Sequence, residues 1–97
     1  MDYRTALDSN AMDEKKTVFI AEDHQLFRDG LKAMLASKDG LEVVGEARDG
    51  LEAINSIKKR QPDLLLLDLS MPRLSGISVI KELRRQFPDM RILVLTI

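Results

Sequence analysis

A run of four leucines that ends directly in a carboxylate constrains this chain more than any other feature. Leu64 to Leu67 precede Asp68, Pro62 lies just before them, and a loop marked by Pro72 and Gly76 follows. A short apolar run between such breakers is typical of a strand buried on both faces, as in a parallel sheet. Asp68 is therefore predicted at the carboxyl edge of a buried strand, where open α/β sheets bind their ligands.

A second apolar run, Thr17 to Ala21, ends in the acidic pair Glu22-Asp23. If the two strands are parallel neighbours, Glu22, Asp23 and Asp68 converge at one edge. Carboxylates at such short range repel each other, so the cluster requires a divalent cation or retained protons. Oxygen ligands favour Mg²⁺ over Zn²⁺, because the chain has no cysteine and only one histidine nearby.

Strand-like and helix-like segments alternate along the whole chain, which predicts βαβ units and a parallel sheet. Helices are expected from Asp23 or His24 to Asp39-Gly40, from an N-cap at Asp49, and from an N-cap at Ser75 to Pro88. The four expected strands are Thr17–Glu22, Leu41–Ala47, Asp63–Asp68 and Arg91–Ile97.

Apolar residues at helical spacing predict which helix faces are buried. In the first helix Phe27, Leu31, Met34 and Leu35 follow the i, i+4, i+7, i+8 spacing, so Phe27 and Met34 are assigned to the core, as is Phe87. The inward residues expected in the later helices are Ala53, Ile54, Ile57, Val79, Ile80, Leu83 and Phe87.

The spacing of these motifs resembles the receiver domain of two-component response regulators. Glu22-Asp23 follows the first strand, Asp68 ends the third, Met71-Pro72 and Gly76 lie in the next loop, and Thr96 ends the fourth strand. The stretches Glu22–Leu31 and Val43–Gly50, together with the Asp68 loop, look most like receivers of the NarL/LuxR type. The resemblance covers Thr17 to Ile97. It implies an α/β, flavodoxin-like, doubly wound parallel sheet with strand order 2-1-3-4.

The resemblance also implies a function in phosphorelay signal transduction. Asp68 would accept a phosphoryl group from a phosphohistidine on a sensor histidine kinase, as a phosphoacceptor rather than an enzyme. Asp23, Asp68 and the backbone carbonyl of Ser70 would bind Mg²⁺ directly, with Glu22 acting through water or by holding the direct ligands. The Thr96 hydroxyl would sense the phosphoryl group. The switch would regulate transcription through a DNA-binding domain that is absent from these residues.

The length of 97 residues predicts one domain, with residues 1–16 as a flexible leader and residues 17–97 as a receiver truncated after the fourth strand. Ser9-Asn10-Ala11 before Met12 looks like the end of an expression tag, and the alternative is a native extension. The last helix–strand–helix of a receiver is missing, with its phosphoryl-contacting lysine. The open edge of the fourth strand is therefore expected to cause self-association.

Composition excludes several other classes of protein. A net charge of −1 gives no bulk attraction to nucleic acid, so DNA is expected as a partner only through an absent domain. The lack of cysteine excludes disulfides and suits a reducing cytosol. No apolar run approaches the roughly 20 residues of a membrane span, so a cytoplasmic location without membrane contact is expected.

Two competing functions remain open. A phosphatase-like hydrolase with an aspartate nucleophile resembles Asp-x-Asp-x-Thr, but this chain has Ser70 where the second aspartate would stand. A non-phosphorylated interaction module would need the fold and the first-helix face but not Asp68. Among single residues, His24 is interpreted as an exposed first-turn residue rather than a ligand, and Pro72 as a cis or tightly turned position.

Overall fold

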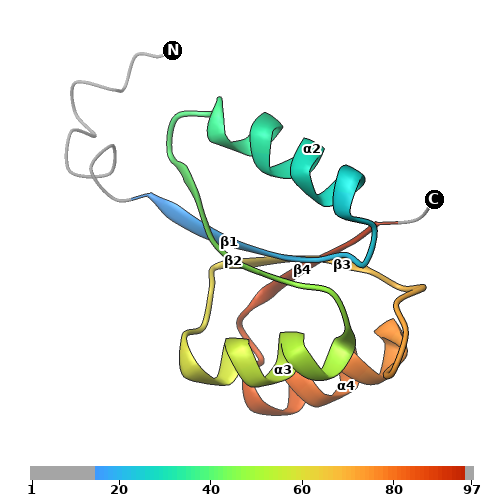
Figure 1. Cartoon of the computed structure of the whole chain (residues 1–97). Helices are drawn as coiled ribbons and strands as arrows, with labels where there is room; N and C mark the ends of the chain where they lie inside the picture. Colours follow the sequence, from blue (N-terminus) through green and yellow to red (C-terminus); the bar gives the residue numbers. More distant parts are fainter. Residues whose placement is uncertain (1–14, 96–97) are drawn as a thin grey trace.

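The computed structural model describes residues 15–95, and Thr96 and most of the expected leader lie outside them. Strands and helices alternate through this part of the chain (Figure 1). The elements are β1 (Lys16–Ala21), α2 (Gln25–Ala36), β2 (Leu41–Ala47), α3 (Gly50–Lys59), β3 (Leu64–Asp68), α4 (Gly76–Gln86) and β4 (Arg91–Leu95).

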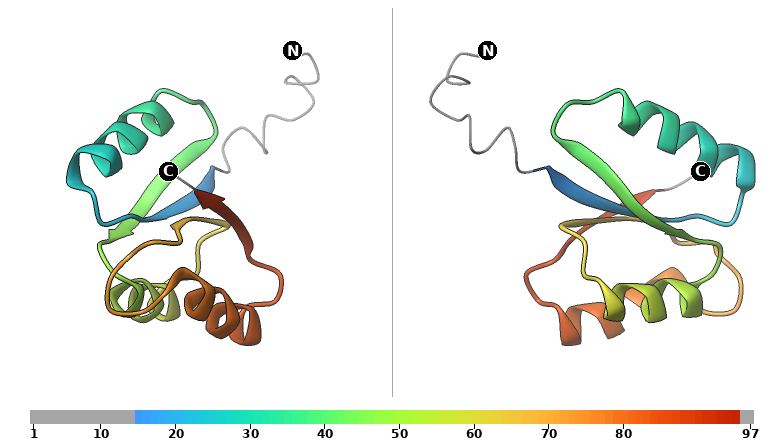
Figure 2. Two further views of the ribbon diagram at one scale, coloured as in Figure 1. Left: turned by 90° about the vertical axis from the view of Figure 1, so that its right-hand side faces the viewer. Right: turned by 60° about the vertical axis from the view of Figure 1, so that its left-hand side comes forward.

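All four strands form one parallel sheet in the order β2-β1-β3-β4. Helix α2 covers one face of the sheet, and α3 and α4 lie side by side on the other face (Figures 1 and 2). The chain leaves β1 toward β2 on one side and then returns past β1 to β3 on the other. The order reverses at β1 and β3, where open α/β sheets bind their ligands, and it confirms the predicted flavodoxin-like arrangement.

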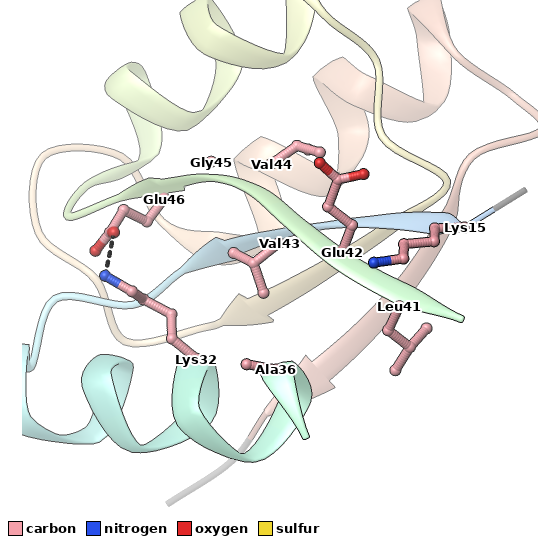
Figure 3. A pocket seen from close by; sticks show the side chains of 9 residues that line it. All are labelled: Lys15, Lys32, Ala36, Leu41, Glu42, Val43, Val44, Gly45 and Glu46. Carbon is pink, nitrogen blue, oxygen red and sulfur yellow. Dashed lines mark hydrogen bonds and ion pairs between the residues drawn. The ribbon is translucent and has the colours of Figure 1, made fainter. Parts of the chain in front are cut away.

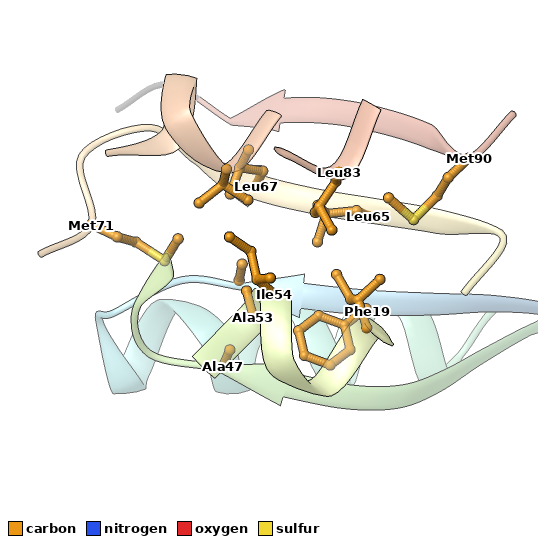
Figure 4. Packing of buried hydrophobic residues seen from close by; sticks show 12 residues of the cluster. Phe19, Ala47, Ala53, Ile54, Leu65, Leu67, Met71, Leu83 and Met90 are labelled. Atoms are coloured by element: carbon orange, nitrogen blue, oxygen red, sulfur yellow. The ribbon is translucent and has the colours of Figure 1, made fainter. Parts of the chain in front are cut away.

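The four leucines of β3 serve both faces of the sheet, because successive side chains of a strand point in opposite directions. Leu65 and Leu67 are fully buried in the larger core cluster, beneath α3 and α4 (Figure 4). Leu66 belongs to a smaller cluster on the α2 side, with Val18 and Ile20 of β1. A continuous apolar run is thus what a central strand covered on both faces requires.

The predicted helix starts on the α3 and α4 side are confirmed. Asp49 Oδ1 accepts a hydrogen bond of 2.9 Å from the backbone N–H of Glu52, and Ser75 Oγ accepts one of 3.2 Å from the N–H of Ser78. Each cap satisfies a backbone donor that the first turn leaves free. The caps fix where α3 and α4 begin, and therefore how they pack on β3.

Several predicted boundaries are off by a residue or more. Strand β1 begins at Lys16, which had been placed in the leader, and it ends at Ala21, so Glu22 lies beyond the strand. Strand β3 begins at Leu64, one residue after the predicted Asp63, whose carboxylate accepts a hydrogen bond of 2.8 Å from the N–H of Thr17. Helix α2 has its C-cap at Ser37, before the predicted Asp39-Gly40 turn.

The prediction that Phe27 and Met34 belong to the core is wrong. Their exposed fractions are 39% and 54%, whereas Leu31 is buried. Among the described residues α2 is the only helix on its face of the sheet (Figure 2). Residues on the flank of α2 have no neighbouring helix in this part of the chain to cover them. Phe87 is half-buried and packs against the larger core cluster.

Strand β4 forms one edge of the sheet, as predicted, and no further strand pairs with it among residues 15–95. Leu93 and Val94 are exposed on it. Across the described elements, no helix has the length and apolarity that a membrane crossing demands.

Candidate phosphoacceptor site

The acidic residues at the ends of β1 and β3 come together, as predicted. One side-chain ligand atom from each of Glu22, Asp23, His24 and Asp68 lies within 4.8 Å of the others. The parallel pairing of β1 with β3 produces this meeting, because both strands end at the same edge of the sheet. The backbone N–H of Glu22 also donates a 3.0 Å hydrogen bond to the carbonyl of Ala47 at the end of β2.

Two of the three carboxylates of this cluster are buried, and the third, Asp23, is 28% exposed. Glu22 is fully buried and Asp68 is 2% exposed. Three of their oxygens, Glu22 Oε1, Asp23 Oδ1 and Asp68 Oδ2, are buried without a hydrogen-bond partner in the described part of the chain. Burying ionised carboxylates is costly unless a cation compensates them. The donor set therefore fits a hard divalent cation such as Mg²⁺.

His24 lies against the cluster although its side chain is 62% exposed. Its Nδ1 is 2.7 Å from Glu22 Oε2 and 3.2 Å from Asp23 Oδ1, the latter an ion-pair distance without hydrogen-bond geometry. The hydrogen bond to Glu22, followed by the charge of Asp23, raises the pKa of His24 above its ordinary value. The predicted exposure of His24 is confirmed, and its ring nevertheless contacts the acidic cluster.

The two oxygens of Asp68 have different surroundings. Oδ1 accepts hydrogen bonds from the backbone N–H of Ser70 at 3.0 Å and from the Ser70 hydroxyl at 2.9 Å. Oδ2 has no hydrogen-bond partner among residues 15–95. Ser70 therefore fixes the rotation of the carboxylate and leaves one oxygen for a ligand.

The loop after Asp68 turns sharply at Arg73, whose φ is 73°. The N–H of Leu74 donates to the carbonyl of Pro72 at 2.9 Å, which closes a three-residue turn of a rare, strained kind. Arg73 also lies 3.6 Å from Asp49 at the start of α3. None of the peptide bonds between described residues is cis, so Pro72 is the first residue of a tight turn with a trans peptide bond.

Gly76 brings the start of α4 close to this loop. A Cβ atom at Gly76 would lie 2.6 Å from the Cα of Leu69, so only glycine fits there. The N–H of Gly76 donates to the carbonyl of Leu69 at 3.3 Å. Gly76, predicted to mark this loop, thus allows the start of α4 to pack closely against Leu69, the residue after Asp68.

Sequence reasoning missed Arg28, which is 3% exposed and contacts the Glu22 backbone. The available signal was its position three residues before Leu31 and seven before Leu35, on the buried face of α2. Thr96, the predicted switch residue, lies outside the described residues.

Comparison with known proteins identifies the family. Residues 18–97 match the model of the response regulator receiver domain, and the chain belongs to that family. The transcriptional regulatory protein YhcZ of Bacillus subtilis is 52% identical over 79 residues, which are 81% of this chain and 37% of YhcZ. The chain spans about two fifths of the length of the curated relatives that it matches.

Solved structures agree with this assignment. The signal receiver domain of NarL from Mycobacterium tuberculosis is 38% identical with a TM-score of 0.81, over 86% of this chain and 67% of that one. RcsB from Salmonella enterica serovar Typhimurium, bound to the rprA promoter, is 37% identical with a TM-score of 0.79, over 86% of this chain and 43% of RcsB. The chain is thus a receiver domain with NarL-type relatives, and this class of domain acts in phosphorelay signalling.

Proposed function

We propose that Asp68 is the phosphoacceptor of this receiver and that its donor is a phosphohistidine on a sensor histidine kinase. The observation that carries the proposal is the asymmetry of the Asp68 carboxylate. Ser70 holds Oδ1, whereas Oδ2 is buried beside the acidic cluster and has no partner in the described part of the chain. In the transfer, a carboxylate oxygen bonds to phosphorus, the phosphorus–nitrogen bond breaks, and the imidazole leaves.

We assign Mg²⁺ to the cluster, with Asp23, Asp68 and the Ser70 backbone carbonyl as direct ligands and Glu22 acting through water. The three unpartnered buried oxygens support this assignment. When bound, Mg²⁺ supplies positive charge to the phosphoryl oxygens. The ligand residues are held by the fold. Glu22 and Asp23 directly follow the end of β1, and the Ser70 N–H orients the Asp68 carboxylate.

The output we propose is regulation of transcription in the cytoplasm, through a DNA-binding domain beyond these residues. YhcZ is described as a transcriptional regulatory protein, and RcsB is bound to a promoter. In this proposal the Thr96 hydroxyl senses the phosphoryl group at the end of the fourth strand.

Phosphorylation by acetyl phosphate with Mg²⁺ tests the proposal. The wild-type chain should acquire a hydroxylamine-labile acyl phosphate, visible by intact mass, and Asp68→Asn should acquire none. Asp39→Asn, which removes the same charge from an exposed turn, is the matched control. Equal labelling of Asp68→Asn and wild type would reject Asp68 as the acceptor.

We also propose that the 97-residue chain associates with itself through the edge of β4. The exposed Leu93 and Val94 and the unpaired side of this edge strand support the proposal. Sedimentation should show a mass that rises with concentration, and the edge amides of β4 should resist hydrogen exchange. A concentrated monomer with unprotected β4 amides would reject it.

A second candidate function is a non-phosphorylated interaction module. The exposed apolar surface of α2, which includes Leu26, Phe27 and Met34, favours it. Asp68→Asn distinguishes the two functions, because it should abolish a phosphoryl-dependent response and leave binding through α2 unchanged.

A further inference from the structure

We propose that Arg28 is a positioning residue that sets the Mg²⁺ affinity of the acidic cluster by holding the backbone from which Glu22 and Asp23 project. The inference rests on the proposed Mg²⁺ site. Arg28 lies one turn into α2, and its side chain runs back to the loop between β1 and α2.

The guanidinium of Arg28 binds three acceptors, which lie on β2, on α2 itself and in the loop that follows β1. Nη1 donates to the backbone carbonyl of Glu22 at 2.6 Å and Nε donates to Glu46 Oε1 at 2.7 Å. Nη2 donates to Gln25 Oε1, also at 2.7 Å. Since Arg28 is only 3% exposed, water competes little for these bonds.

The carbonyl that Arg28 binds belongs to the peptide unit that joins Glu22 to Asp23. On its other side, the Glu22 N–H is already held by the Ala47 carbonyl of β2. Glu22 is thus fixed at both its backbone groups, once to the sheet and once to the helix. Rotation of either peptide would turn the Glu22 and Asp23 carboxylates away from Asp68. Arg28 therefore controls the direction of two of the three carboxylates.

Glu46 anchors the guanidinium from the neighbouring strand. Its second oxygen accepts a 2.6 Å hydrogen bond from Lys32 Nζ, along the groove between α2 and β2 (Figure 3). The hydrogen bond to Lys32, and next that to Arg28, lower the pKa of Glu46, so it stays ionised near neutral pH. Lys32 shares this carboxylate with Arg28, and its charged partners are Glu46 and Asp29 rather than the loop of Glu22. It is a natural control.

Charge and geometry make opposite predictions for the loss of Arg28. A cation close to a metal site repels Mg²⁺, so by electrostatics alone the removal of Arg28 would tighten Mg²⁺ binding. If Arg28 positions the ligands, its loss weakens binding instead. Arg28→Lys isolates geometry, because lysine keeps the charge but cannot present a planar fork to three acceptors.

The experiment measures Mg²⁺ dissociation constants of the full chain by calorimetry, alongside urea unfolding of each variant. We expect Kd to rise about tenfold in Arg28→Lys, at the lower end of what loss of an outer contact to a metal site causes. Lys32→Met, which removes the other cation on Glu46, should change Kd by less than about twofold by the same reasoning. An unchanged or lower Kd in a folded Arg28→Lys variant overturns the inference.

Glu46→Gln covers the case in which Arg28→Lys fails to fold. It keeps the shape of the anchor and weakens its hold on Arg28, so its Kd should rise clearly above that of Lys32→Met. Wild-type affinity in Glu46→Gln beside an unfolded Arg28→Lys would make Arg28 a structural residue only and overturn the inference. A wild-type chain that binds no Mg²⁺ overturns the proposed function and this inference together, whereas a variant result alone leaves the proposed function intact.

Discussion

Replacing Asp68 with asparagine should stabilise the folded chain when divalent cations are removed by a chelator. Asparagine keeps Oδ1, which Ser70 binds, and replaces the unpartnered Oδ2 with an N–H₂ group that can donate to neighbouring carboxylates. The variant therefore removes a buried negative charge from the cluster without removing an existing hydrogen bond.

The magnitude follows from the geometry of the cluster. Ligand atoms within 4.8 Å of one another, in a medium of effective dielectric constant about 20, give a repulsion of roughly 3.5 kcal/mol for each ionised pair. The hydrogen bond from the His24 ring to Glu22 and the partial exposure of Asp23 reduce the net repulsion. We expect a gain of about 1–3 kcal/mol in the free energy of unfolding. For a domain of this size, each kcal/mol raises the melting temperature by about 4–8 °C.

Thermal unfolding followed by circular dichroism, at low salt and near neutral pH, measures this gain. Asp39→Asn changes the net charge equally at an exposed site and should melt with the wild type. Saturating Mg²⁺ should reverse the order, because ligand binding stabilises only the chain that keeps the site. The reasoning is refuted if Asp68→Asn melts at or below the wild-type temperature in chelator while Asp39→Asn is unchanged.

Three further predictions concern the frame around the site. Leu67→Ala should lower the free energy of unfolding by about 2–5 kcal/mol in urea titrations, because Leu67 is fully buried in the larger core cluster. Arg73→Gly should raise it by roughly 0.5–1 kcal/mol, since glycine adopts the positive φ at this turn without steric cost. The backbone N–H of Thr17, as the largest cause, lowers the pKa of Asp63 below its ordinary 3.8. The Asp63 carboxylate therefore stabilises the folded chain above pH 3.8, and this contribution is lost as the pH falls through the folded-state pKa of Asp63. Asp63→Asn should remove that part of the pH dependence of the free energy of unfolding, measured by urea titration.

The parts of the fold that follow local rules could be predicted from the sequence. Asp49 and Ser75 were recognisable as helix caps because capping depends on one side chain and a backbone N–H three residues later. The meeting of Glu22 with Asp68 was predictable because parallel strands end at the same edge of a sheet. The order 2-1-3-4 required the resemblance to a family as well, since alternation alone fixes a parallel sheet but not its sequence of strands.

The errors share a different origin, which is the placement of one helix relative to its neighbours. The helical spacing predicts Phe27, Leu31, Met34 and Leu35 as the buried face of α2. In the structure Arg28 and Leu31 are buried and Leu35 is partly buried, whereas Phe27 and Met34 are exposed. Counting apolar residues therefore finds Leu31 and Leu35 but misses Arg28, which lies about 100° from Phe27 around the helix.

Burial of Arg28 is favourable only because each of its three guanidinium nitrogens donates to an acceptor. One of these, Glu46, lies eighteen residues further along the chain on an edge strand, and another is the backbone carbonyl of Glu22, which has no sequence signature. A rule that ranks residues by hydropathy treats arginine as the outward residue and phenylalanine as the inward one. Here the loop that carries two carboxylates of the site lies next to α2, so the helix turns its hydrogen-bonding residue toward that loop and leaves Phe27 on the flank. The same requirement that exposes Phe27 therefore fixes the Glu22-Asp23 peptide.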